Sequence, residues 1–329
     1  MPKLPKQFKS IADQKLMRSI ESSMELVETR LLEATAHAEQ TVDTISSHLA
    51  RAGGKRLRPV LVLVTSHLGD PARDEVLDAA VVMEITHLAT LYHDDVMDQA
   101  ETRRGVDTAH TVWGNNIAIL VGDLLFARAS NIVSHLGEEA LKLQAEVFEQ
   151  LVLGQLHETM GAGDADPLQH YLDVIRDKTG SLIALSARLG ALLSGADASY
   201  QEPLRLFGER IGIAFQLADD LIDIRSAEED SGKVAGTDIL AGVPTLPVLL
   251  LASQGDDEST QLAADIAAAN EATIGDVLTR LRDHAVMDQA EEITQRWADD
   301  AIAAIDPLPD GSVKSALIAF AEAVVNRKG

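Results

Sequence analysis

Apolar residues recur at three- and four-residue steps along most of this 329-residue chain, and this periodicity most constrains its fold. Such a spacing gathers apolar side chains on one face of an α-helix, whereas a half-buried strand needs strict alternation. The helical pattern is clear in residues 19–49, 75–98, 115–136, 138–160 and 180–195. Strand-like runs are scarce, and the prolines fall between the helical runs. The sequence therefore predicts an all-α fold of about ten or more helices.

Composition supports a single helical domain. Apolar residues make up 46% of the chain and aromatic residues only 3%, so the core must consist mainly of Leu, Ile, Val and Ala. No internal repeat and no low-complexity linker is visible. We expect one domain over residues 1–329, with residues 1–30 as an N-terminal helical extension and a loop in the Gly- and charge-rich stretch 226–247.

The charge balance excludes several classes of function. Lys and Arg number 28 against 52 Asp and Glu, a net charge of −24, which argues against general nucleic-acid binding and against an anionic membrane as obligatory partner. The absence of cysteine excludes disulfides and thiolate zinc sites. No apolar run approaches the ~20 residues of a membrane span. The basic, polar N-terminus lacks the apolar stretch of a signal peptide, so we expect a cytoplasmic protein without a membrane anchor.

Two segments carry three aspartates each with the spacing D-D-x-x-D. On a helix the first and last of these share a face at i and i+4, where like charges are destabilising unless something neutralises them. One such cluster would ordinarily be a solvated acidic face, but two copies in apolar helical contexts favour a cation site. Oxygen ligands without His or Cys suit Mg²⁺, which binds a few carboxylates together with phosphate oxygens. The residues are Asp94, Asp95 and Asp98 in the first cluster and Asp219, Asp220 and Asp223 in the second.

Basic side chains stand out in so acidic a chain, and several follow glycines or the aspartates. Glycines let a backbone approach an anion closely, and arginine offers a bidentate fork to phosphate. Lys178 precedes Thr179 and Gly180 at what looks like a helix start, where a phosphate oxygen would be met. Each group alone could be a solvated loop or a charge match. The other basic residues are Lys55, Arg56 and Arg58 in "GGKRLRP", Arg103 and Arg104 after the first cluster, and Lys233 after the second.

Five landmarks in this order resemble the trans-isoprenyl diphosphate synthases, or polyprenyl synthetases: "GGKRLRP", "HDDVMDQAETRRG", "DKTGSL", "FQLADDLIDI" and "GKVAGTD" followed by "TLP". The resemblance runs from about Leu31 to the C-terminal region. The full second aspartate cluster distinguishes the chain from class I terpene cyclases. The resemblance implies the isoprenoid synthase type I fold, an antiparallel helical bundle around a central cavity, and a homodimer. It also implies an Mg²⁺-dependent prenyltransferase that condenses an allylic diphosphate with isopentenyl diphosphate, head to tail.

The same resemblance implies a role for each candidate residue. Three Mg²⁺ ions on Asp94, Asp98, Asp219 and Asp223, supported by Asp95 and Asp220, would hold the allylic diphosphate. The residues that would contact this diphosphate and the developing cation are Arg103, Lys178, Thr179, Gln216 and Lys233. Those that would hold isopentenyl diphosphate are Lys55, Arg58, His87 and Arg104. The chain departs from the pattern at Val243, where many members carry a lysine.

Product length would depend on the residues about one turn before Asp94. Ala89 and Thr90 are small where short-product members carry bulky aromatics, which implies an all-trans product of about C30 to C50. Met83 or Phe126 deeper in the pocket could set a shorter stop. The alternatives are a geranylgeranyl- or farnesyl-type synthase, a terpene cyclase, or a non-catalytic subunit of a heteromeric synthase, which would typically lack aspartates of one cluster.

Overall fold

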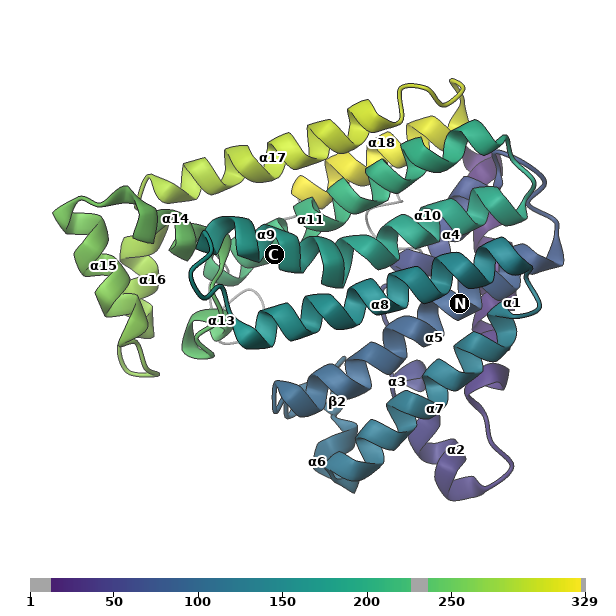
Figure 1. Cartoon of the computed structure of the whole chain (residues 1–329), viewed down its shortest axis with the longest axis horizontal. Coiled ribbons are helices and arrows are strands. Elements are labelled where there is room, and N and C mark those ends of the chain that lie inside the picture. Colours follow the sequence, from purple (N-terminus) through teal and green to yellow (C-terminus); the bar gives the residue numbers. More distant parts are fainter. Residues whose placement is uncertain (1–12, 226–235, 327–329) are drawn as a thin grey trace. The chain divides into compact units, whose positions relative to one another are not determined.

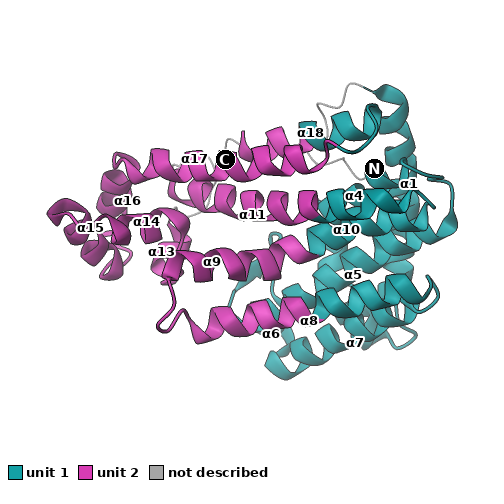
Figure 2. Ribbon diagram, turned by 45° about the horizontal axis from the view of Figure 1, so that its top comes forward, with its two compact units in different colours: residues 1–148, 182–205, 307–319 teal, residues 149–181, 206–306, 320–329 magenta. Residues whose placement is uncertain are grey.

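The computed structural model describes residues 13–225 and 236–326 and is 77% helical, which confirms the all-α prediction (Figure 1). The β-structure of the described residues is one antiparallel pair of two-residue strands, β1 (Thr102–Arg103) and β2 (Val106–Asp107). The chain divides into two compact units (Figure 2). Unit 1 holds residues 1–148, 182–205 and 307–319, and unit 2 holds residues 149–181, 206–306 and 320–329. The single domain over residues 1–329 stays a prediction.

Unit 1 is built around helix α5 (Asp74–Met97), which packs against α1, α4 and α7. Residues on every side of α5 are buried, as expected for a helix in the middle of a core. The largest buried side chains include Leu61, Met83, Leu88 and Leu125. The helices with most or all of their residues in unit 1 are α1 (Gln14–Thr35), α2 (Gln40–Ser46), α3 (His48–Arg51), α4 (Leu57–Ser66), α5, α6 (Ala109–Trp113), α7 (Asn115–Val133), α10 (Ser181–Leu193) and α18 (Ser312–Val325).

The N-terminal helix α1 starts at the cap residue Asp13, whose carboxylate accepts a hydrogen bond from Leu16 N at 3.1 Å. One face of α1 is buried in unit 1. The helical pattern of residues 19–49 is divided among three helices, α1, α2 and α3. Ala36 is extended, and the Asp43 carboxylate accepts from His37 N at 3.0 Å, so a side chain replaces the helical hydrogen bond there.

Unit 2 has a core of Leu, Ile and Val side chains, including Leu217, Leu251 and Leu281. The cluster also holds Tyr171 and Ile224. Its helices are α9 (Pro167–Ile175), α13 (Thr237–Leu240), α14 (Leu246–Gln254), α15 (Asp257–Ala267), α16 (Ile274–Arg282) and α17 (Val286–Ala304), with parts of α8 (Glu138–Met160) and α11 (Gln201–Arg225).

The helix start predicted at Lys178 is wrong. A π-helical turn, Arg176–Gly180, joins α9 to α10 without a break, and Ser181 N donates to Arg176 O. A Cβ on Gly180 would lie 2.9 Å from the Glu209 carbonyl oxygen, so the glycine permits a close approach to α11. Such turns inside helices are frequent at functional sites.

The expectation that no apolar run approaches the length of a membrane span is not met by helix α7, which is long and apolar enough to cross a membrane by length and composition alone. Core helices can have the same length and composition, and 33% of the most apolar 18-residue stretch of α7 is buried. Within unit 1 it packs most extensively on α5. Several of its large apolar side chains remain exposed: Ile117, Ile119 and Leu120.

Candidate functional site

The first aspartate cluster lies at the C-terminal end of α5, where the core helix leaves the interior. Asp94 is half-buried on the last turn and Asp98 is exposed just after it, with Asp98 N donating to Asp94 O at 2.8 Å. The i, i+4 spacing puts the two carboxylates on one face. The C-terminal end of a helix is the negative end of its dipole. The negative charges of Asp94 and Asp98 therefore lie where a cation would stabilise them.

Asp95 differs from its neighbours, because it is buried and already has a cation. Its Oδ1 accepts from Arg103 Nε at 2.7 Å, while its Oδ2 is buried without a hydrogen-bond partner. Burial raises the pKa of Asp95, and the Arg103 charge opposes that shift. The structure thus gives Asp95 the role of holding Arg103.

A tight β-hairpin, which the sequence analysis missed, carries both arginines. Arg103 pairs with Val106 across β1 and β2, and the two residues between them, Arg104 and Gly105, have φ of 55° and 78°. Positive φ at both central residues is the signature of the type I′ hairpin turn. Arg103 is directed to Asp95, whereas Arg104 donates to the carbonyl oxygens of Gly53 and Leu49. The hairpin therefore directs the two adjacent arginines to different partners.

Arg104 lies beside the Gly53–Pro59 segment of the sequence. A Cβ on Gly54, whose φ is 147°, would lie 2.7 Å from Arg104 Cζ, so this glycine makes room for an arginine rather than for an anion. Arg58 nearby is half-buried, but its Nε is buried without a hydrogen-bond partner, and this burial lowers the pKa of Arg58 to about 10. Burial, and next the Arg58 charge, hold the pKa of His87 well below its usual value, so the imidazole is neutral at pH 7. Lys55 is exposed.

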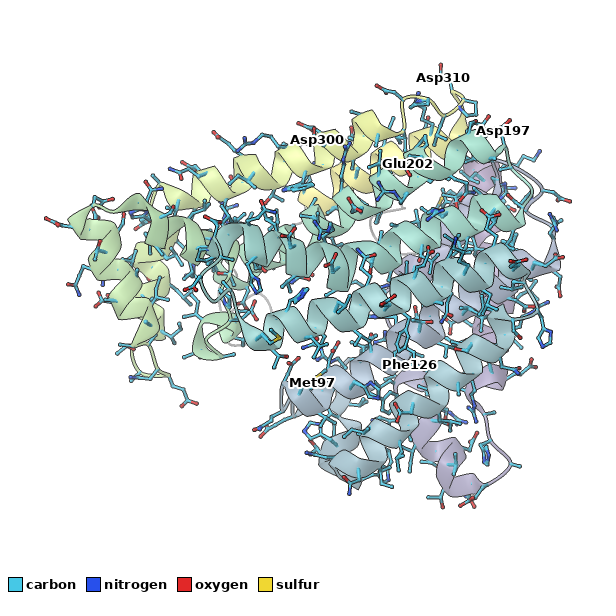
Figure 3. The ribbon with its side chains drawn as sticks, in the orientation of Figure 1. Met97, Phe126, Asp197, Glu202, Asp300 and Asp310 are labelled. Atoms are coloured by element: carbon cyan, nitrogen blue, oxygen red, sulfur yellow. The ribbon has the colours of Figure 1, made fainter. Side chains whose placement is uncertain are left out.

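The residues predicted to set product length lie one turn before the aspartates. Ala89 is buried, and Thr90 is half-buried with its hydroxyl donating to His87 O at 2.8 Å. Tyr92 points elsewhere, since its hydroxyl donates to Ile45 O. Phe126 of α7 is labelled in Figure 3. Its ring packs at a tilt against the ring of Phe148 on α8, with centroids 4.4 Å apart.

In the second cluster, Asp220 is buried and its Oδ2 is fully engaged. It accepts from the Tyr171 hydroxyl, and from Leu246 N at 3.0 Å. Burial raises the pKa of Asp220 to about 7. Asp220 therefore ties α11 to α9 and to the start of α14, as a support for its neighbours.

Asp219 and Asp223 form the half-buried i, i+4 pair of this cluster. Asp223 accepts from Thr237 Oγ1 at 2.9 Å and from Asp238 N at 3.2 Å. Asp238 was missed by the sequence analysis, although "GTD" displays it. Its pKa rises to about 6 through burial and then through the charges of Asp223 and Asp219. Asp219 and Asp223 thus repel Asp238 electrostatically, and a bound divalent cation would relieve this repulsion.

The remaining predicted residues of unit 2 lie in different settings. Lys178 Nζ donates to Glu158 Oε2 at 2.6 Å. Thr179 and Gln216 are half-buried, and Val243 is 44% exposed. Lys233 lies outside the described residues.

In the described part of the chain, no three acidic or histidine side chains converge as a ready-made metal site. Each cluster instead offers an i, i+4 pair of carboxylates whose middle aspartate is used internally. This arrangement fits Mg²⁺, which typically takes part of its shell from water and substrate phosphates. It does not fit a metal that requires a closed protein cage.

Comparisons with known proteins identify the family of the chain. Residues 39–283 match the model of the polyprenyl synthetase family, and the chain belongs to this family. It is 41% identical to nonaprenyl diphosphate synthase of Mycobacterium tuberculosis over 93% of this chain and 91% of the relative.

Solved structures are equally similar. Geranylgeranyl pyrophosphate synthase from Corynebacterium glutamicum, complexed with calcium and isoprenyl diphosphate, has a TM-score of 0.87 and 41% identity over 96% of this chain and 98% of that one. Polyprenyl synthase from Caulobacter crescentus, in a complex with the same components, has a TM-score of 0.87 and 32% identity over 98% and 99%. The predicted family and its helical fold are confirmed.

Proposed function

We propose that this protein condenses an allylic diphosphate with isopentenyl diphosphate, head to tail, to give an all-trans polyprenyl diphosphate of about C30 to C50. The observation that carries this proposal is the repeated D-D-x-x-D cluster, with an outer pair of carboxylates and an internally engaged middle aspartate in both copies. Family membership supports the reaction class. The medium-to-long product is supported by the nonaprenyl relative and by the small side chains at Ala89 and Thr90.

Divalent cations belong to this proposal. Asp94, Asp98, Asp219 and Asp223 would hold Mg²⁺, three ions with substrate bound, and Asp238 would add charge to the second group. Calcium in the two relatives' complexes supports a divalent ion at this kind of site. When bound, the ions would neutralise the negative charge of the departing diphosphate, whose departure generates an allylic cation.

The chain's own residues orient the reactants. Arg103, held by Asp95, and Lys178, held by Glu158, would contact the allylic diphosphate, with Lys233 as a further contact. Thr179 and Gln216 would lie near the developing cation. Lys55, Arg58, Arg104 and neutral His87 would hold isopentenyl diphosphate, whose double bond attacks the cation. A proton then leaves to the departed diphosphate, so no protein nucleophile is required.

Chromatography of the dephosphorylated product tests this function. Purified protein with Mg²⁺, farnesyl diphosphate and labelled isopentenyl diphosphate is expected to give alcohols of about C30 to C50. A product that stops at C20 would assign the protein to the geranylgeranyl type, and a hydrocarbon without diphosphate would make it a cyclase. No product from the purified protein alone would favour a heteromeric enzyme.

Replacing Ala89 by Phe is expected to shorten the product by two or more isoprene units, because a ring one turn before Asp94 would block the growing chain. Product chromatography measures the length, and Thr90→Phe provides a second, less buried position. Ala303→Phe, on an exposed site of α17, should leave the length unchanged. An unchanged product from both Ala89→Phe and Thr90→Phe would remove this wall from the cavity.

A homodimer through α7 is also proposed, since this apolar helix leaves Ile117, Ile119 and Leu120 exposed. Leu120→Glu would place a charge on each side of such an interface and is expected to yield monomers in sedimentation equilibrium. Leu26→Glu, an exposed leucine of α1, is the matched control and should stay dimeric. A dimer of undiminished affinity in Leu120→Glu would exclude α7. We propose a cytoplasmic location on the charge balance of the chain.

A further inference from the structure

Glu84 is a buried carboxylate that none of the proposed steps uses. It lies on α5, 1% exposed, in the interior of unit 1. A buried charge is costly unless it is paired, so its partners explain why it is tolerated. Glu84 Oε1 accepts from Arg56 Nη1 at 2.6 Å and pairs with Arg104 Nη2 at 3.4 Å.

Arg56 is fully occupied by protein groups. Its Nε and Nη2 donate to Glu28, at 2.6 and 3.2 Å, and its Nη1 donates to Glu84. It also donates to the carbonyl oxygens of Ala50 and Gly53, at 2.9 and 3.3 Å. With all three nitrogens engaged, Arg56 has no free donor fork for a phosphate. It acts instead as a brace for the carbonyl groups that precede α4.

The same carbonyl groups hold Arg104. Gly53 O accepts from both Arg56 and Arg104, and Leu49 O accepts from Arg104 at 3.2 Å. Glu84 thus reaches Arg104 twice, once directly and once through Arg56 and the shared Gly53 carbonyl. Both arginines also have left-handed backbone conformations, with φ of 50° and 55°. Residues other than glycine rarely adopt this backbone conformation, so the surrounding contacts must hold Arg56 and Arg104 in it.

We infer that Glu84 is a positioning residue, which fixes the guanidinium group of Arg104 by its direct contact with Arg104, so that Arg104 and Arg58 present a preformed subsite to a diphosphate that carries no metal. The inference rests on the proposed function, in which these arginines hold isopentenyl diphosphate. The half-buried Arg58, whose Nε is buried without a hydrogen-bond partner, supplies the unsatisfied donor of the subsite. A carboxylate that served only as counter-charge would weaken diphosphate binding, and its removal would strengthen it. If Glu84 instead positions Arg104, its removal should weaken diphosphate binding.

Calorimetric titration of inorganic pyrophosphate into the purified full chain, with EDTA to exclude metal-bridged binding, tests this inference. Glu84→Gln is expected to weaken pyrophosphate binding about tenfold or more, since it loosens a charged hydrogen-bond donor. Glu28→Gln is the matched control: it also removes a carboxylate from Arg56 but makes no contact with Arg104. It should change the affinity by less than about twofold.

A background of Arg104→Lys distinguishes positioning from a general structural role. There, Glu84→Gln should add little further loss, because the group through which it acts has gone. The inference would be overturned if Glu84→Gln bound pyrophosphate as tightly as the wild type or more tightly, or if Glu28→Gln lost as much affinity. It would also be overturned if the losses of Glu84→Gln and Arg104→Lys were additive, or if the wild-type protein bound no pyrophosphate in EDTA. Product formation with Mg²⁺ is measured separately, so the proposed function is tested independently of this inference.

Discussion

Asp94→Ala is expected to lower kcat by about 10²- to 10³-fold, the usual effect of removing one group that stabilises developing charge. Asp94 lies at the negative end of the α5 dipole, beside two further carboxylates. Loss of its charge should therefore leave the free energy of unfolding unchanged or slightly increased. Steady-state kinetics with saturating Mg²⁺ measures the first effect and urea unfolding the second.

Asp288→Asn is the control for Asp94→Ala, because Asp288 is an exposed carboxylate on α17. It should retain kcat within about twofold. If Asp94→Ala keeps near-wild-type turnover, the assignment of the first cluster to a metal-bridged diphosphate is wrong. If it loses turnover only because it unfolds, Asp94 has a structural role.

Asp219→Ala should reduce kcat by a similar factor, about 10²- to 10³-fold, whereas its neighbour should behave differently. In Asp220→Ala, the Tyr171 hydroxyl and Leu246 N lose their common acceptor inside the unit 2 core. Leaving two buried donors unsatisfied costs about 2–5 kcal/mol, so Asp220→Ala should mainly lower the free energy of unfolding. The two adjacent aspartates would then have different roles, Asp219 as a metal ligand and Asp220 as a structural residue.

Urea unfolding of both variants, and kcat below the unfolding transition, measure this separation. Tyr171→Phe should reproduce part of the stability loss of Asp220→Ala, because it removes one of the two donors. Equal stability losses in Asp219→Ala and Asp220→Ala would contradict the division of roles.

How much of this site the sequence predicts depends on how local the interactions are. The helices over 75–98, 115–136 and 138–160 follow from apolar periodicity, and α5, α7 and α8 match them closely. The i, i+4 aspartate pairs follow from spacing alone. The hairpin at Arg103 and Arg104 does not, since two-residue strands carry too little pattern to be seen, and "RG" is a weak turn signal.

Other features depend on contacts between residues far apart in the sequence. The sequence shows three basic residues after two glycines, but not that Arg56 is saturated by Glu28, Glu84 and carbonyl groups. Likewise, helix-start rules reveal neither the π-helical turn at Lys178 nor the close approach of Gly180 to Glu209 on α11. Asp238 was visible in "GTD", yet its importance appears only from the charges of Asp219 and Asp223 beside it.

The central claim is that both aspartate clusters serve one metal-bridged diphosphate. Calorimetry with an unreactive allylic thiolodiphosphate tests it most directly, with isopentenyl diphosphate present to fill the arginine subsite. The account predicts tight binding by the wild type only with Mg²⁺, loss of that binding in Asp94→Ala and in Asp219→Ala, and little further loss in the double variant. Binding that persists in EDTA, or losses that add independently in the double variant, would contradict it.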